Sequence, residues 1–169
     1  IALESSHEMI KLFKRNSKIK IYNLDMRKLN RIKISKFDGI TCLWNVFGHL
    51  KNNQERISVL KKIRNKMNSK STFITDVNNR HNAESYGYFK VILRIILDKF
   101  FFKEERGNTI YNLKMNDESV KASGHLFTPK EFSNNLKQAG FEIIKIYSIN
   151  YLNGKVMKSL INGQLLFIA

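Results

Sequence analysis

The sequence contains little that would stabilise a fold covalently or through a metal ion. Its 169 residues include one cysteine, Cys42, so no disulfide can form within the chain. It has four histidines but no Cys-x-x-Cys or His-Glu-x-x-His spacing, and we therefore expect no metal site. Because Cys42 lies in an apolar run, a buried free thiol is its predicted state.

Long apolar stretches are also missing. No uncharged apolar run reaches the ~18 residues of a membrane-spanning helix. No secretory signal is present either, although a chain that begins within a fold could have lost one, and we expect a cytoplasmic protein. The composition is still that of a folded domain, since 43% hydrophobic and 11% aromatic residues are too many for a disordered segment. A chain of this length can bury a single core.

Acidic residues are scarce relative to basic ones. The chain has 30 Lys and Arg against 14 Asp and Glu, a formal net charge of +16. A charge of this size is compatible with nucleic-acid binding. The basic residues are spread from Lys11 to Lys158, and no RNP-like, zinc-finger or helix-turn-helix pattern accompanies them. A composition generally rich in Lys, Asn and Ile explains the charge as well, and we favour that explanation.

Apolar periodicity changes repeatedly between strand and helix spacing, which predicts an α/β fold. The near-continuous apolar run of residues 37–43 is typical of a central parallel strand. A helix is predicted over residues 53–68, and another begins at Thr128, where Thr-Pro-Lys-Glu has the composition of a capping box. The other predicted strands are residues 1–3, 19–21, 72–77, 141–149 and 163–169, with a turn at 68–71.

Residues 84–123 interrupt this alternation. Residues 86–103 predict a very apolar helix, on which Lys90, Arg94 and Asp98 form one narrow polar stripe at four-residue spacing. Two short strands, 109–115 and 119–123, are predicted around a turn at 116–117. We interpret the block as an insertion within one domain, with the helix as a lid packed on the fold. The alternative is an interfacial helix that docks on a membrane surface or a partner.

Two acidic residues follow predicted strands near the start of the chain. Glu4 ends the first apolar piece, and Asp25 follows the second, about twenty residues later. Ligands of α/β sheets bind beyond the carboxyl ends of the strands, and a carboxylate accepts two hydroxyl donors at once. The pair therefore suggests a nucleoside-shaped ligand. The alternatives are helix-dipole complementation by Glu4 and a loop carboxylate paired with Arg27 or Lys28 at Asp25.

Residues 3–10 and 23–29 resemble the second-strand and third-strand motifs of class I S-adenosylmethionine-dependent methyltransferases. The resemblance implies that Glu4 and Ser5 bind the cofactor ribose. It also implies that Asp25 and Met26 bind the adenine ring.

Residues 37–50 resemble the fourth strand of that fold. Their Cys-Leu-x-Asn-x-Phe-x-His-Leu pattern is similar to glycine N-methyltransferase and related small-molecule N-methyltransferases. The resemblance implies that Leu43, Asn45 and His49 line the methionine end of the cofactor pocket. Asn45 would also face the substrate, which makes it the candidate catalytic residue. A structural role is the alternative for His49.

Residues 75–82 resemble a strand that ends in Asp-His-Arg-Asn in the glycine-type enzymes, where the Arg holds the substrate carboxylate. Here Asn78 occupies that position and Arg80 lies two residues further along, which argues against glycine as the substrate. A polar loop is the alternative, but loops at strand ends are where this fold places substrate groups. The candidate substrate-binding residues are Asn78, Arg80, Tyr86, Tyr111 and His125.

Residues 124–141 resemble the late helix and sixth strand of the family, and 163–169 would be its antiparallel seventh strand. No Gly-x-Gly-x-Gly loop is present in the sequence, although the family uses one to approach the cofactor. The resemblance implies that residues 1–169 begin within the second strand. They would then lack a strand, glycine loop and helix of on the order of 30 residues.

The sequence thus predicts a partial class I methyltransferase domain, residues 1–169, with a lid-like insertion at 84–123. Its sheet is expected to be Rossmann-like and mostly parallel with an antiparallel last strand. The function implied is methyl transfer from S-adenosylmethionine to nitrogen or oxygen of a small polar molecule. The alternatives are an RNA or protein methyltransferase, and a non-catalytic remnant that acts as a binding module. The residues expected on central strands are Leu3, Ile21, Cys42, Ile74 and Ile144.

Overall fold

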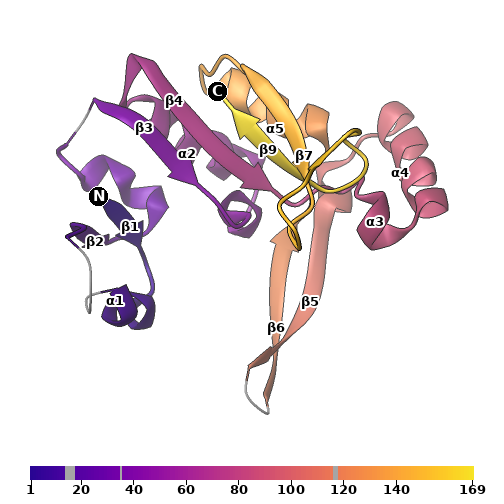
Figure 1. Cartoon of the computed structure of the whole chain (residues 1–169), viewed down its shortest axis with the longest axis horizontal. Coiled ribbons are helices and arrows are strands. Elements are labelled where there is room, and N and C mark those ends of the chain that lie inside the picture. Colours follow the sequence, from indigo (N-terminus) through magenta and orange to yellow (C-terminus); the bar gives the residue numbers. More distant parts are fainter. Residues whose placement is uncertain (14–17, 35, 116–117) are drawn as a thin grey trace.

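The computed structural model describes residues 1–13, 18–34, 36–115 and 118–169 (Figure 1). The predicted turn at 116–117 lies outside this range. Within it, no helix is long and apolar enough to cross a membrane.

The described strands of the α/β fold form three separate sheets, one of which is a hairpin. β1 (Ala2–Glu4) and β2 (Ile21–Asn23) pair in parallel, with Glu4 opposite Asn23. In the larger sheet the order is β3-β4-β9-β7-β8. The bounds in that sheet are β3 Phe37–Cys42, β4 Met67–Val77, β7 Lys145–Ile149, β8 Val156–Met157 and β9 Gln164–Ile168.

The strand directions confirm the predicted antiparallel last strand. β3 pairs in parallel with β4, and β9 runs antiparallel to both β4 and β7. β3, β4 and β7 therefore point one way and β9 the other.

Of the residues expected on central strands, Ile74 on β4 lies on one. Leu3 and Ile21 lie in the two-stranded sheet, and Cys42 lies on β3 at the edge of the larger sheet. Ile144 precedes β7 and is 69% exposed. The Phe141 amide still donates to the Leu136 carbonyl of the preceding helix, and the strand predicted over 141–149 begins only at Lys145.

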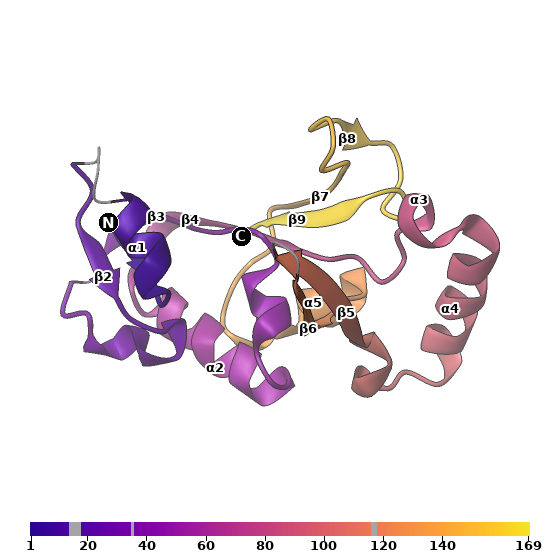
Figure 2. The same ribbon diagram turned by 90° about the horizontal axis from the view of Figure 1, so that it is seen from below.

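Helices α2 (Asn53–Arg64) and α5 (Pro129–Gln138) lie side by side under one face of the larger sheet (Figure 2). The predicted helix 53–68 is too long, because the chain leaves α2 at Arg64 and Met67 already pairs with Phe37 of β3. The predicted turn at 68–71 falls within β4. These four residues interrupt its ladder with β3, since Met67 pairs with Phe37 and Thr72 with Gly39. The remaining helices near this sheet and β1–β2 are α1 His7–Phe13, η1 Met26–Arg31 and η2 Val46–His49.

The core between the sheet and these two helices is built on phenylalanine. Phe132 of α5 has its ring centroid 5.5 Å from Phe47, 5.0 Å from Phe127 and 5.0 Å from Phe167. All four side chains are fully buried, and the inclined rings place edges against faces, the arrangement that aromatic quadrupoles favour. Phe132 thus joins α5 to η2, to β9 and to the segment just before the helix.

The block of residues 84–123 forms α3 (Ala83–Tyr86), α4 (Tyr88–Phe100), η3 (Glu104–Gly107) and a hairpin. The hairpin strands β5 (Asn108–Met115) and β6 (Glu118–His125) pair antiparallel, from Asn108 opposite His125 onward. The predicted helix and two strands are confirmed, with the helix ending at Phe100. Figure 1 shows the hairpin projecting away from the sheet and α4 at the end of the molecule opposite β1 and β2.

The predicted start of α5 is confirmed as a complete capping box. The Thr128 Oγ1 accepts from the Glu131 amide at 3.1 Å, and the Glu131 carboxylate accepts from the Thr128 amide at 3.2 Å. Replacing Thr128 by Ala should lower the unfolding free energy by about 1 kcal/mol, because the Glu131 amide loses its acceptor. Urea denaturation of the two chains measures this difference.

The matched control is Thr128→Ser, which keeps the hydroxyl acceptor and should unfold close to the unsubstituted chain. Equal urea midpoints for the Ala and Ser variants would show that the cap contributes nothing.

Candidate functional site

The carboxyl ends of β1 and β2 lie at one edge of their sheet. The side-chain amide of Asn23 donates to the backbone carbonyls of Glu4 and Ser5, each at 3.1 Å, which joins the two strand ends. Glu4 is half-buried, and its Oε1 accepts from the Ser6 amide at 2.7 Å at the start of α1. Glu4 therefore stands at the carboxyl edge of this strand pair, and one of its oxygens supports the start of the helix.

Asp25 is engaged with its own loop. Its Oδ1 accepts from the amide and Nε of Arg27 at 2.8 and 2.9 Å, and its Oδ2 accepts from Nη2 at 2.5 Å. The hydrogen bond from Arg27 is the main reason that the pKa of Asp25 lies below its ordinary value. The alternative of a paired loop carboxylate is thus what the structure contains. Met26, the first residue of η1, packs against the core.

Asn45 links the ends of β3 and β4. Its amide donates to Oδ1 of Asp76 at 2.9 Å, and its side-chain Oδ1 accepts from the Asn78 amide at 2.9 Å. Trp44 and Asn45 have φ values of 70° and 53°, the left-handed region that Asn tolerates but Trp rarely adopts. Non-glycine residues held in this region occur often at functional sites.

Gly48 is required by this turn. A Cβ on Gly48 would lie 2.3 Å from Nδ2 of Asn45, so any larger residue would displace the side-chain amide of Asn45. The backbone also returns on itself here, since the Gly48 amide donates to the Asn45 carbonyl at 2.9 Å. Asp76, Asn78 and the backbone of Gly48 together fix the position of Asn45.

Asp76 and Tyr151 extend this site, and sequence reasoning included neither. Oδ2 of Asp76 accepts a hydrogen bond from the Tyr151 hydroxyl, across 75 positions in the chain. Burial, with a further contribution from Asp76, raises the pKa of Tyr151 far above its ordinary value. The Tyr151 ring meets Trp44 edge-on at 6.0 Å. An acidic residue at a strand end was a usable signal for Asp76, whereas no local pattern marks Tyr151.

The remaining residues predicted around the methionine end of the cofactor diverge. Leu43 is 42% exposed beside Trp44, which is 80% exposed. His49 lies on η2 and its Nδ1 is 3.3 Å from the Ser123 carbonyl of β6. Leu43, Asn45 and Asn78 are therefore brought to one edge, while His49 is turned toward the hairpin.

Arg80 and His125 are occupied by protein partners. The Arg80 Nε donates to Asp98 at 2.8 Å, and its Nη1 donates to the Arg106 carbonyl. His125 is 1% exposed, with Nδ1 2.8 Å from Asn108 and Nε2 2.8 Å from Glu131. Neither side chain offers a free polar group to a substrate, contrary to the prediction, because burial forces each to satisfy its polar atoms within the fold.

The two predicted tyrosines lie in the block of residues 84–123. Tyr86 is half-buried, and the Arg94 guanidinium lies 4.5 Å from its ring centroid. Tyr111 of β5 lies against Gly124, where a Cβ would stand 3.3 Å from its ring. Asn45, Asp76, Asn78 and Tyr151 are joined by hydrogen bonds and form what we call the Asn45 cluster. Within the described part of the chain, neither tyrosine forms a hydrogen bond with this cluster.

Two surface depressions lie away from these strand ends. One is lined by residues of α5, of the segment 141–143 and of β7, and the other by Asp38 and residues 68–71, at the opposite ends of β3 and β4. Neither contains the polar side chains gathered around Asn45. We therefore place the candidate site from these side chains and not from the depth of a surface depression. No group of three or more potential metal ligands occurs among the described residues.

No family model matches the chain, and no curated protein matches it. Solved structures do match. An S-adenosylmethionine-dependent methyltransferase from Clostridium acetobutylicum superposes with a TM-score of 0.61 at 17% identity, over 98% of this chain and 72% of that one. The chain has the fold of these methyltransferases.

Further solved structures share that fold. An S-adenosylmethionine-dependent methyltransferase from Methanosarcina mazei has a TM-score of 0.66 at 16% identity, over 98% of this chain and 78% of its own. An amino pentose methyltransferase from Micromonospora echinaspora, solved with S-adenosylmethionine bound, has a TM-score of 0.61 at 16% identity, over 98% and 71%.

Cys42 provides a probe of the site because it is the single cysteine. Burial, and then the nearby charge of Asp76, raise its pKa from 9.0 to about 12. At pH 8 the native thiol should therefore react with a disulfide reagent much more slowly than the same chain in urea. Stopped reactions followed by absorbance give both rates.

The same shift affects stability. The unfolded thiol ionises near its ordinary pKa while the folded thiol keeps its proton, so unfolding becomes easier as the pH rises from about 8.5 toward the folded pKa. Equal reaction rates with and without urea would contradict the burial of Cys42.

Proposed function

We propose that this chain is the larger part of an S-adenosylmethionine-dependent methyltransferase that methylates nitrogen or oxygen of a small polar molecule. The observation that carries the proposal is the Asn45 cluster at the carboxyl ends of β3 and β4, within the methyltransferase fold. In such sheets ligands bind beyond the carboxyl ends of the strands. Related structures include a glycopeptide N-methyltransferase and an amino pentose methyltransferase, which supports a small polar acceptor.

The residues present fit the adenosine half of the cofactor. Glu4 and Ser5 stand at the end of β1, and Asp25 and Met26 follow β2, so both pairs lie at the same edge of a parallel strand pair. Glu4 has an oxygen that is not committed to Ser6 within the described structure, as a ribose contact requires. Asp25 would have to accept from adenine with lone pairs that Arg27 leaves free.

The chemistry asks little of the protein. S-adenosylmethionine, when bound, supplies an electrophilic methyl group. The chain's part is to place the acceptor atom in line with it, and well-oriented placement alone removes a large share of such barriers. Asn45 suits this task because its backbone is held by Asp76 and its Oδ1 by Asn78, which leaves the Nδ2 hydrogens as donors. Leu43 and Asn78 border the same edge.

Asp76 adds a negative charge to this edge. Both of its oxygens are engaged, one by the Asn45 amide and the other by the Tyr151 hydroxyl. A carboxylate so held stabilises positive charge nearby, which suits an amine acceptor as its nitrogen gains a methyl group. Trp44 and Tyr151 supply aromatic surface beside it, and aromatic faces also attract cations.

We also propose that a further strand with a glycine turn completes the site between β1 and β3. No ladder joins β1–β2 to β3–β4 within the described residues. In the doubly wound order 3-2-1-4-5, strand 1 lies between strands 2 and 4, which β1 and β3 would represent. Among the described residues, no helix covers the second face of the larger sheet (Figure 2). The half-buried Ile74 and Ile168, which are paired across β4 and β9, lie on that face.

The proposal predicts that residues 1–169 alone bind S-adenosylmethionine weakly or not at all, because the backbone turn that would meet its carboxypropyl group is missing. Calorimetric titration of this chain measures the affinity. The coding sequence upstream of Ile1 should contain a strand followed by Gly-x-Gly, and the longer chain should bind. Micromolar binding by the 169 residues alone would show that the extra strand is not needed.

Substitutions in the longer chain separate the cofactor from the substrate. Glu4→Ala should weaken S-adenosylmethionine binding by roughly 1.5–3 kcal/mol, because ribose hydroxyls lose a charged acceptor. Asn45→Ala should instead lower turnover, on the order of a hundredfold for a misplaced acceptor, with a smaller effect on cofactor affinity. One titration and one rate measurement give both results.

Ser5→Ala is the matched control for Glu4→Ala at the strand end and should cost less, since a hydroxyl carries no charge. An unchanged affinity in Glu4→Ala would mean that Glu4 only supports the start of α1. Reduced cofactor binding without loss of turnover in Asn45→Ala would refute the substrate-positioning role.

A further inference from the structure

Helix α4 turns two of its charged side chains, Arg94 and Asp98, toward the protein. The Asp98 carboxylate is 6% exposed and lies 2.8 Å from Arg80 Nε and 3.0 Å from His81 Nε2. Arg94 donates to the Arg80 carbonyl at 3.1 Å, and Val91 is buried on the same side. The inner face of α4 is thus fixed by an ion pair and hydrogen bonds to the loop that follows β4.

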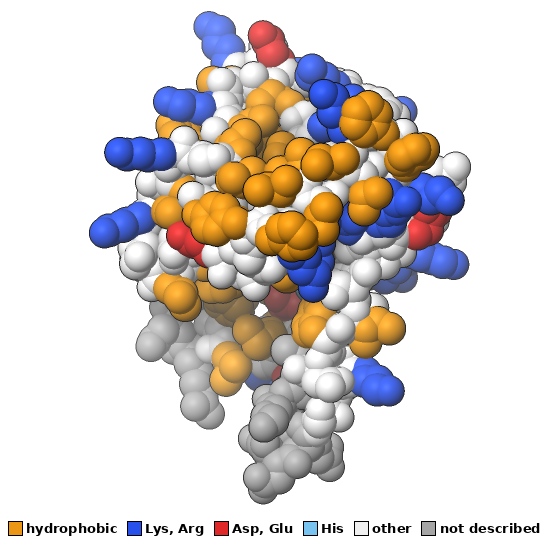
Figure 3. Space-filling view, turned by 90° about the vertical axis from the view of Figure 1, so that its right-hand side faces the viewer, with side chains coloured by type: hydrophobic (Ala, Val, Ile, Leu, Met, Phe, Trp, Pro, Cys, Tyr) orange, Lys and Arg blue, Asp and Glu red, His pale blue; other side chains and the backbone are white. Residues whose placement is uncertain are grey.

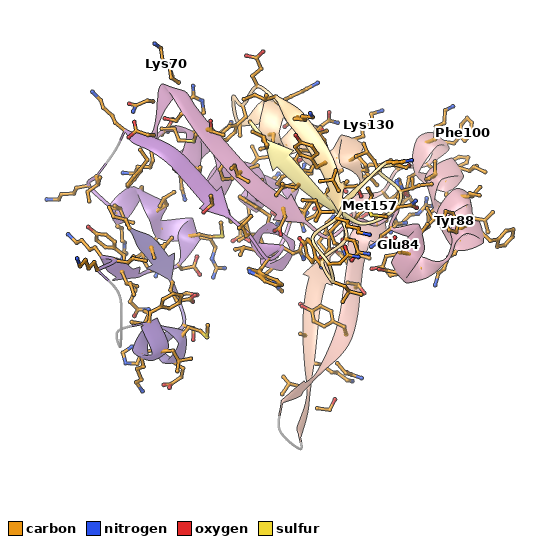
Figure 4. All side chains as sticks on the ribbon, in the orientation of Figure 1. Lys70, Glu84, Tyr88, Phe100, Lys130 and Met157 are labelled. Atoms are coloured by element: carbon orange, nitrogen blue, oxygen red, sulfur yellow. The ribbon has the colours of Figure 1, made fainter. Side chains whose placement is uncertain are left out.

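The outer face of α4 is apolar. Phe89, Leu93, Ile96 and Phe100 follow one another at four-, three- and four-residue spacing, so they share one stripe on the helix. They are 78%, 46%, 49% and 67% exposed, respectively. Figure 3 shows hydrophobic side chains gathered over this end of the molecule, and Figure 4 places Tyr88 and Phe100 at the two ends of the helix.

Basic residues flank the stripe on both sides. At about 100° per residue, Lys90 lies about 90° to one side of it and Lys99 about 90° to the other. Asp98 is the only acidic residue between Gly87 and Lys103, and it faces inward. Figure 3 shows Lys and Arg side chains around the apolar surface. The exposed surface of this segment therefore combines apolar and positively charged groups.

Rolling α4 about its axis does not hide the stripe. Such a rotation would pull Asp98 away from Arg80 and leave a buried charge without its partner, which is strongly unfavourable. A contiguous apolar surface of this kind is rare on a monomer and marks an interaction site.

The arrangement of charge favours one kind of partner. A second copy docked through the same face would bring Lys90 and Lys99 against lysines of another chain of charge +16. An anionic membrane surface is complementary to the whole face, since lysine ammonium groups reach lipid phosphates while their stems and the neighbouring rings enter the acyl boundary. A 13-residue helix is about 20 Å long, which suits a helix lying in the plane of that boundary.

We propose that α4 docks this protein on an anionic membrane surface, with Phe89, Leu93, Ile96 and Phe100 inserted and Lys90 and Lys99 at the level of the phosphates. The proposal goes beyond the methyl-transfer function and does not depend on it.

The test is vesicle flotation of the 169-residue chain. Vesicles of phosphatidylcholine and phosphatidylserine in equal amounts should carry the chain upward, and vesicles of phosphatidylcholine alone should carry far less. The double variant Phe89→Glu with Phe100→Glu should lower partitioning at least about tenfold, because two inserted rings are replaced by charges that anionic lipid repels. Lys90→Ala and Lys99→Ala should each lower it about fivefold on the anionic vesicles.

The matched control is Ile110→Glu with Leu152→Glu. It makes the same change of charge at two exposed apolar side chains away from α4, which are 74% and 97% exposed, and should partition nearly like the unsubstituted chain. Circular dichroism checks that both double variants remain folded. Equal partitioning of the two double variants overturns the proposal, because membrane binding would then depend on net charge alone and not on the apolar stripe of α4.

Two other results would also overturn it. One is equal binding to vesicles with and without phosphatidylserine. The other is no vesicle binding, together with a lipid-free dimer in light scattering that Phe89→Glu with Phe100→Glu dissociates. That result would assign the face to a second copy.

Discussion

The geometry of the site depends on the hydrogen bonds that Asn45 makes across two strands. Its amide is held by Asp76 and its side chain by the Asn78 amide, so the loops after β3 and β4 have one fixed relation. The unfavourable φ of Trp44 is tolerated because the hydrogen bonds of Asn45 to Asp76 and to Asn78 hold the turn in place. Strain of this kind persists only where the surroundings determine the conformation. Gly48 and Tyr151 contribute to that determination from η2 and from the loop after β7.

Local sequence pattern was sufficient for features that depend on near neighbours. The capping box at Thr128, the strand end at Glu4 and the two-stranded hairpin were all predicted. The length of α2 was not, because the apolar stripe of the helix continues through Met67 while pairing with Phe37 draws that residue into β4. A tertiary ladder overrode a local periodicity there, as it does wherever strand pairing supplies more hydrogen bonds than another helical turn.

The site residues that sequence reasoning missed are those fixed by distant partners. Tyr151 reaches Asp76 across 75 positions, and no motif spans that distance. Arg80 shows the converse. The resemblance placed Arg80 near the substrate, but its guanidinium pairs with Asp98. The sequence showed that Asp98 belongs to a polar stripe on an apolar helix, but it did not show that Arg80 is the partner of Asp98. A buried charge needs a specific counter-charge, and only the folded chain shows which residue provides it.

The short loop after β4 therefore serves two surfaces at once. Asn78 accepts from Phe127 through its carbonyl and donates to Asn45 through its amide, while Arg80 and His81 hold Asp98 of α4. Burial is the largest influence on His81 and lowers its pKa. Burial is also the largest single influence on Asp98 and acts to raise its pKa, but the hydrogen bonds and charges of Arg80 and His81 together lower that pKa below its ordinary value. The pair is thus most stable with Asp98 charged, and acidification through these groups weakens it. One short loop therefore connects the Asn45 turn, through Asn78, to the inner face of α4, through Arg80 and His81.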